Sequence, residues 1–155
     1  MSNFIFEDPN FKSWKSEVIA NGLVLKRVEC VGEVIRDGGQ VYAALIDCQI
    51  VTPEGSYFRC VVLRGDTVVV IPLLTCRSNG GEYTLLVDQL RIAHGKKIEE
   101  FPAGMVDRNK NDPVLAAVEE VREELGIDLD SSELIPLNET PFNTIPSLTD
   151  EVTNF

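Results

Sequence analysis

Residues 104–127 read GMVDRNKNDPVLAAVEEVREELGI, and this stretch predicts a single amphipathic helix. Asp112 suits the N-cap and Pro113 the first helical position, while Gly126 can adopt the left-handed conformation that ends a helix. At about 100° per residue, such a helix gathers three carboxylates on one face and apolar side chains on the other. The acidic face carries Glu120, Glu123 and Glu124, flanked by Ala116 and Ala117, and the apolar face carries Val114, Val118, Val121 and Leu125.

Three like charges on one helix face repel one another, so their clustering is unfavourable unless a positive charge lies among them. Carboxylate oxygens are the ligands that a small hard dication such as Mg²⁺ prefers. The glutamates therefore predict a metal site. The alternative is an acidic face that is simply solvated, as on many amphipathic helices, and the helix alone does not decide between the two.

The helix and the residues before it resemble the signature of the Nudix hydrolases, Gly-x5-Glu-x7-Arg-Glu-aliphatic-x-Glu-Glu-x-Gly-aliphatic. The matching residues, which follow Pro102 and Ala103, are Gly104, Glu120, Val121, Glu123, Glu124, Gly126 and Ile127. Two positions depart from the signature. Glu119 stands where the family has arginine, and the loop glutamate falls at Asn111, in a loop one residue longer than the pattern.

The resemblance implies a hydrolase that uses Mg²⁺, with Mn²⁺ as a second option. It assigns the metal to Glu120, Glu124 and the carbonyl of Ala103, and Glu123 to a second metal or to orienting water. In relatives, a loop before the next strand often supplies the general base, which here corresponds to Glu151, with Glu123 as the fallback. Because two signature residues are replaced, a catalytically impaired domain that binds or scaffolds a nucleotide sugar is the alternative to an active enzyme.

The segment upstream narrows the expected substrate. Gln89-Leu-Arg91, followed by Glu100-Phe-Pro-Ala-Gly104, is similar to an arrangement in Nudix enzymes that cleave ADP-ribose and nucleoside-diphosphate sugars. Arg91 offers a planar donor fork that matches phosphate oxygens, and Gln89 can donate and accept toward a base or sugar. Gln89, Arg91 and Glu100 are therefore expected to bind substrate. The alternatives are that Gln89 and Arg91 form the solvent-facing half of a strand, or that another diphosphate, such as a dinucleoside polyphosphate or coenzyme A, is cleaved.

The composition of the chain limits the classes of binding partner and the cellular compartment that we expect. A formal net charge of −11 argues against nucleic acid, and a metal ion would reconcile that charge with an anionic substrate. We expect no membrane span and no signal peptide. The scattered cysteines, Cys30, Cys48, Cys60 and Cys76, predict small buried hydrophobes in a reducing compartment, the cytoplasm. His94 is expected in a turn at residues 93–97.

The rest of the chain predicts strands before the helix. The β-rich runs are residues 23–35, 41–51, 57–63, 67–74 and 82–91. We expect an α+β fold, a Nudix-type αβα sandwich with a mixed sheet and a small N-terminal antiparallel sheet from about residue 17 to 58. The predicted domains are an N-terminal β subdomain, 1–58, through which relatives often form homodimers, and a Nudix domain, 59–155. The latter is expected to be truncated, because relatives continue beyond the strand that begins at Val152.

Overall fold

The structure is a computed structural model that describes residues 4–36, 40–106, 112–138, 140–143 and 152–154. The chain divides into two compact units. One unit comprises residues 1–66 and 143–152, and the other comprises residues 67–142 and 153–155. The boundary predicted between residues 58 and 59 stays a prediction.

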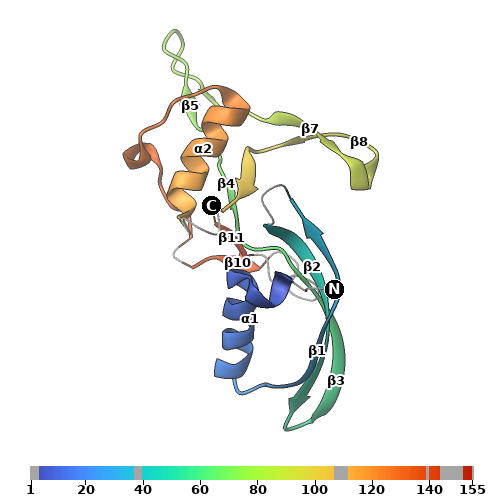
Figure 1. The fold of residues 1–155 in the computed structure, drawn as a ribbon. Helices are drawn as coiled ribbons and strands as arrows, with labels where there is room; N and C mark the ends of the chain where they lie inside the picture. Colours follow the sequence, from blue (N-terminus) through green and yellow to red (C-terminus); the bar gives the residue numbers. More distant parts are fainter. Residues whose placement is uncertain (1–3, 37–39, 107–111, 139, 144–151, 155) are drawn as a thin grey trace. The chain divides into compact units, whose positions relative to one another are not determined.

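The first unit contains the predicted N-terminal antiparallel sheet, in the order β1-β2-β3 (Figure 1). Its elements are a 3₁₀ turn at Phe4–Glu7, α1 at Pro9–Ala20, β1 at Val24–Ile35, β2 at Val41–Thr52 and β3 at Gly55–Leu63. Alternate residues of β2, namely Ala44, Ile46 and Cys48, are buried on one face of the sheet, as a two-residue period requires. They form a core with Ile5 and Phe11, which lie on the 3₁₀ turn and α1.

Helix α1 corrects the prediction that the sheet begins near residue 17, because residues 9–20 are helical. Helix α1 begins with an Asp-Pro pair, the same signal that predicts the start of the helix at residue 113. The Asp8 carboxylate accepts a hydrogen bond from the backbone N–H of Asn10 at 2.9 Å, and Pro9 occupies the first turn. Phe11 and Trp14, three residues apart, place their rings on one side of the helix, with ring centroids 5.7 Å apart.

A mixed sheet in the order β10-β11-β4-β9 belongs mostly to the second unit, and in it β11 runs parallel to β4 and β9 antiparallel to β4. Two hairpins, β5–β6 and β7–β8, lie between β4 and β9 in the sequence. The strands are β4 at Thr67–Val69, β5 at Leu74–Thr75, β6 at Glu82–Tyr83, β7 at Val87–Arg91, β8 at Lys96–Glu100, β9 at Ala103–Met105, β10 at Phe142–Asn143 and β11 at Val152–Asn154. Together with helix α2, Pro113–Leu125, and a 3₁₀ turn at Ser131–Glu133, these strands confirm the α+β class.

Two predicted strands are broken in the structure. The run 67–74 separates into β4 and β5, with Pro72, which has no N–H for a sheet, between them. The run 82–91 separates into β6 and β7. The expected turn at 93–97 is shorter: a 3₁₀ turn, Ile92–His94, is closed by Gly95 at φ 65°, and Lys96 already begins β8. His94 is exposed, as a turn residue should be.

Helix α2 has the predicted limits and caps. The Asp112 carboxylate accepts from the N–H groups of Val114 and Leu115, at 3.0 and 3.1 Å, and Gly126 ends the helix at φ 69°. The buried face, however, differs from the prediction. Ala116 and Ala117, which were expected to flank the acidic face, are buried with Val68 and Val106. Small side chains allow close approach to the sheet, so the helix packs on β4 and β9 through its alanines and Val121.

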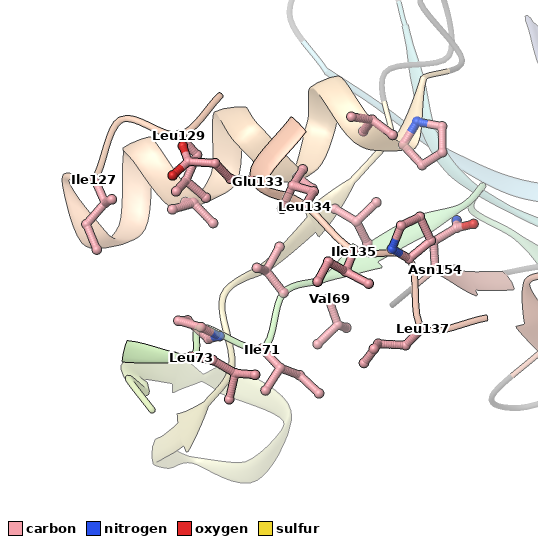
Figure 2. Close-up of a pocket in the computed structure, with 18 of the residues that line it drawn as sticks. Val69, Ile71, Leu73, Ile127, Leu129, Glu133, Leu134, Ile135, Leu137 and Asn154 are labelled. Atoms are coloured by element: carbon pink, nitrogen blue, oxygen red, sulfur yellow. The ribbon is translucent and has the colours of Figure 1, made fainter. Parts of the chain in front are cut away.

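The predicted valine stripe is only partly covered because it borders an apolar cavity of about 500 Å³ within the second unit (Figure 2). Val114, at 38% exposure, lines one side of this groove, and residues 68–74, 127, 129 and 133–138 line the others. Leu73 and Ile135, both shown in Figure 2, are 85% and 79% exposed. We call this cavity the apolar groove.

The four cysteines are free thiols, but they do not share one environment. Cys48 is buried as predicted, whereas Cys60 is exposed on β3, which corrects its prediction as a buried hydrophobe. Cys60 lies opposite Asp47, on the face of the sheet away from the core, because Asp47 and the buried Cys48 are adjacent in β2. Within the part of the chain that the structure describes, no helix has the length and apolar character that a membrane crossing requires.

Candidate active site

Glu120 is seated against the backbone of Gly104, where α2 packs on β9. A Cβ atom at Gly104 would lie 1.6 Å from Glu120 Oε1 and 2.0 Å from its Cδ. The glutamate side chain therefore occupies the volume that any other residue at position 104 would fill. This contact gives a physical reason for pairing a glycine before the loop with the first glutamate of the acidic face.

Glu124 lies one turn further along α2, and both of its carboxylate oxygens accept hydrogen bonds. Gln89 Nε2 on β7 donates to Oε1 at 2.5 Å, and the backbone N–H of Ala103 on β9 donates to Oε2 at 3.2 Å. Glu124 is thus held from two strands. Ala103 lies beside the site as predicted, and the metal-binding role of its carbonyl stays a prediction.

The electrostatics of the acidic face centre on Glu120. Burial raises the pKa of this carboxyl above its usual value, and the neighbouring carboxylates Glu124, Glu123 and Glu119 raise it further. Glu119, in the position of the family's arginine, therefore opposes ionisation of Glu120. Glu123 is exposed on the same helix, whereas Glu120 and Glu124 are half-buried.

The predicted substrate-binding residues are arranged on one face of the β7–β8 hairpin. Gln89 and Arg91 are alternate residues of β7, and Glu100 ends β8. The Arg91 Nε donates to both Glu100 oxygens at 2.9 Å, and its Nη2 also contacts Oε2. This pairing lowers the pKa of Glu100. Arg91 and Glu100 thus contact each other, whereas Gln89 contacts Glu124.

Two further sequence predictions cannot be placed. Glu151, the predicted base, and Asn111, in the position of the loop glutamate, both lie outside the described residues. Among the described residues, no group of three or more His, Cys, Asp and Glu side chains is arranged to hold a metal ion. Two carboxylates do fit Mg²⁺, because this ion keeps several waters and commonly takes one or two protein carboxylates plus substrate phosphates. The raised pKa of Glu120 also indicates a site that a cation would stabilise.

Two features of this site could not be predicted from the sequence. The sequence did not predict strand β8, because Lys96–Glu100 contains one apolar residue, Ile98, and shows no alternation of apolar and polar residues. The contact of Gln89 with Glu124 joins residues 35 positions apart, and no local pattern reports such a contact.

The sequence profile of the NUDIX domain matches residues 63–153, which is more than half of the chain. The chain belongs to the Nudix family. It is 44% identical over 77 residues to Nudix hydrolase 14, chloroplastic, of Arabidopsis thaliana, and the aligned part is 50% of this chain. The match covers only 24% of that relative's length. The name of this relative states no substrate, and its chloroplast location does not fit the strictly cytoplasmic prediction.

Nudix hydrolases as a family act on diphosphate linkages and generally use divalent metals such as Mg²⁺. The geometry at Gly104 identifies what the position of the Glu120 carboxylate requires of the chain. Glu120 can take its position only while residue 104 has no side chain.

We predict that Gly104→Ala displaces the Glu120 carboxylate and weakens binding of Mn²⁺ by roughly 10-fold or more, as loss of metal-site geometry does. Isothermal titration calorimetry of the metal-free protein measures this change. Gly32→Ala is the matched control, because a Cβ there meets nothing within 4 Å. Equal affinities in the Gly104 variant and the wild type would contradict the seating of Glu120.

We also predict a pH-dependent effect of Glu120→Gln on the stability of the metal-free protein. Because folding raises the pKa of Glu120, its carboxyl retains a proton in the folded state at pH values where the unfolded chain has released it. The glutamate therefore costs stability as the pH rises above the usual value of 4.5. The variant should be more stable than the wild type near pH 7, and this advantage should vanish below about pH 4.5.

Urea unfolding in EDTA across this pH range measures the difference in the free energy of unfolding. Glu99→Gln, on an exposed glutamate of β8, is the control for removing one charge from an acidic protein. An advantage of the Glu120 variant that is the same at all pH values would refute the raised pKa.

Proposed function

We propose that this chain hydrolyses the diphosphate linkage of a nucleoside-diphosphate sugar, with a divalent metal, to a nucleoside monophosphate and a sugar phosphate. The observation that carries the proposal is the seating of Glu120 on Gly104, with Glu124 held one turn away. The residues proposed to bind the sugar nucleotide, Arg91 and Glu100, project from the hairpin whose Gln89 contacts Glu124.

Glu120, Glu124 and the Ala103 carbonyl are the proposed metal ligands, with Mg²⁺ as the proposed ion and Mn²⁺ as the second option. When bound, the metal polarises a phosphoryl oxygen and neutralises the charge that develops on it. Glu123, exposed on the same face, is proposed to orient water or to join a second metal.

In the proposed reaction, water attacks one phosphorus of the diphosphate and the bridging P–O bond breaks. The water's proton passes to a carboxylate, for which Glu151 is the proposed base and Glu123 the fallback. The bridging oxygen leaves with the other phosphate, so the products are two monophosphates.

Arg91 is proposed to recognise a substrate phosphate. Its two-point contact with Glu100 orients the guanidinium before any ligand arrives, and its side chain remains 44% exposed. A planar fork held in one orientation loses little freedom on binding phosphate oxygens.

One observation favours a second candidate function, in which the chain binds a nucleotide sugar without turnover. Glu119 replaces the family's arginine and adds to the charges that raise the pKa of Glu120. A carboxylate that resists ionisation is a weaker metal ligand, so the substitution works against catalysis.

A panel of ADP- and UDP-sugars, assayed with Mg²⁺ and with EDTA, tests the proposed function. We expect metal-dependent release of a nucleoside monophosphate and a sugar phosphate, lowered by roughly 100-fold or more in Glu120→Gln, which removes a metal ligand. A dinucleoside polyphosphate and coenzyme A belong in the same panel. If only these two compounds were cleaved, the proposed substrate class of nucleoside-diphosphate sugars would be wrong. Binding of a nucleotide sugar without turnover would establish the second candidate function.

We further propose that the first unit forms a homodimer through the face of its sheet opposite the core. Val34 and Phe58 lie opposite Ala43 and Gln49 of β2, which alternate with the buried residues, and they are 57% and 59% exposed. Exposed apolar side chains gathered on one sheet face commonly mark a protein interface.

Light scattering of the full chain tests the dimer. We expect a dimeric mass that falls to a monomeric mass in Phe58→Asp. Leu73→Asp is the control, since Leu73 is an exposed leucine outside the sheet. A monomeric wild type, or equal loss of the dimer in both variants, would contradict this interface.

The free cysteines fit a reducing compartment, and we propose the cytoplasm. The chloroplastic relative makes the chloroplast the alternative. Microscopy of a fluorescent fusion distinguishes the two.

A further inference from the structure

We propose that Gln89 is a positioning residue, which holds the Glu124 carboxylate for the metal rather than contacting the substrate. The inference rests on the proposed metal-dependent function, and it reassigns a residue that the sequence placed among the substrate contacts. Gln89 is half-buried on β7, and its Nε2 lies 2.5 Å from Glu124 Oε1.

The two hydrogen bonds to Glu124 come from separate strands and reach different oxygens. Gln89 on β7 donates to Oε1, and the Ala103 N–H on β9 donates to Oε2. Together they oppose rotation of the carboxylate about its terminal bond, which is otherwise broad and weakly restricted. Each carboxylate oxygen has about two lone-pair sites, so a donor to each still leaves acceptor capacity for a cation.

The chemical type of the two donors supports this role. An amide and a backbone N–H are neutral, so they orient the carboxylate without cancelling the negative charge that attracts a dication. A lysine or arginine in the place of Gln89 would neutralise Glu124 and compete with the metal. Outer hydrogen-bond partners that orient a metal ligand have this effect in metal sites generally.

Arg91, the neighbouring arginine, binds Glu100, whereas Gln89 binds Glu124. Arg91 lies two residues along β7 on the same face as Gln89, and its guanidinium is bound at two points by Glu100. The hairpin therefore presents a neutral donor to Glu124 and pairs its cation with Glu100. This division assigns metal positioning to Gln89 and leaves phosphate recognition to Arg91.

Titration of the metal-free full chain with Mn²⁺, without substrate, tests the inference. Gln89→Met preserves the approximate shape of the side chain and removes its N–H donors. We expect Mn²⁺ affinity roughly 10- to 100-fold weaker than that of the wild type, as for other residues that orient a metal ligand. Electron paramagnetic resonance of free Mn²⁺ gives the affinity. Asp88→Asn is the matched control, because Asp88 points to the opposite face of the same strand.

Steady-state kinetics on a cleaved nucleotide sugar separate positioning from substrate contact. We expect Gln89→Met to lower kcat at a fixed Mg²⁺ concentration below saturation and to leave KM for the nucleotide sugar unchanged. A raised KM with unchanged Mn²⁺ affinity would assign Gln89 to the substrate and overturn the inference, as would variant and wild-type values that agree throughout.

The Mn²⁺ titration also distinguishes failure of the proposed role of Gln89 from failure of the proposed metal-dependent function. A wild-type chain that binds no Mn²⁺ overturns the metal site and, with it, the role of Gln89. A wild-type chain that binds Mn²⁺ as tightly as Gln89→Met overturns the role of Gln89 alone. If circular dichroism shows that Gln89→Met does not fold, Gln89→Asn retains the amide but is one methylene shorter, and the same loss of Mn²⁺ affinity is expected.

Discussion

The second unit depends on the close approach of helix α2 to strand β9. Ala116 and Ala117 are buried against the sheet, and Gly104 leaves the volume that the Glu120 side chain fills. Three small residues thus set how near the helix lies to the strand. That spacing also brings Glu124 within reach of the Ala103 N–H, so packing and the position of the acidic side chains have one cause. Half-buried carboxylates normally lower the stability of the folded state. A cation bound among these carboxylates would offset that loss of stability.

The sequence was most informative where a single short signal determines the structure. The Asp-Pro pair at 112–113 and Gly126 predicted the limits of α2, and runs of β-forming residues predicted β1 and β2 to within one residue. The same Asp-Pro signal stands at 8–9 before α1, with Phe11 and Trp14 at helical spacing, yet β-rich neighbours outweighed it. The N-terminus of α1 therefore carries the same local helix signal as that of α2.

Other features depend on distances that no local signal reports. The acidic face of α2 was predicted correctly, but the packing of its alanines was not, because helix periodicity gives directions around the axis rather than the element that lies beneath. The pairing of Arg91 with Glu100 crosses a hairpin whose second strand was unrecognised. Glu151 and Asn111 lie outside the described residues, so the identity of the base remains a prediction.

The apolar groove has a consequence for how the chain behaves in solution. Leu73, Ile135 and Leu137 expose large apolar surface, which attracts other apolar surface at short range. A net charge of −11 repels neighbouring molecules at longer range and keeps them apart. Added salt shortens the reach of that repulsion to about 10 Å at 0.1 M while leaving apolar attraction intact. Ionic strength therefore controls the colloidal stability of this acidic protein.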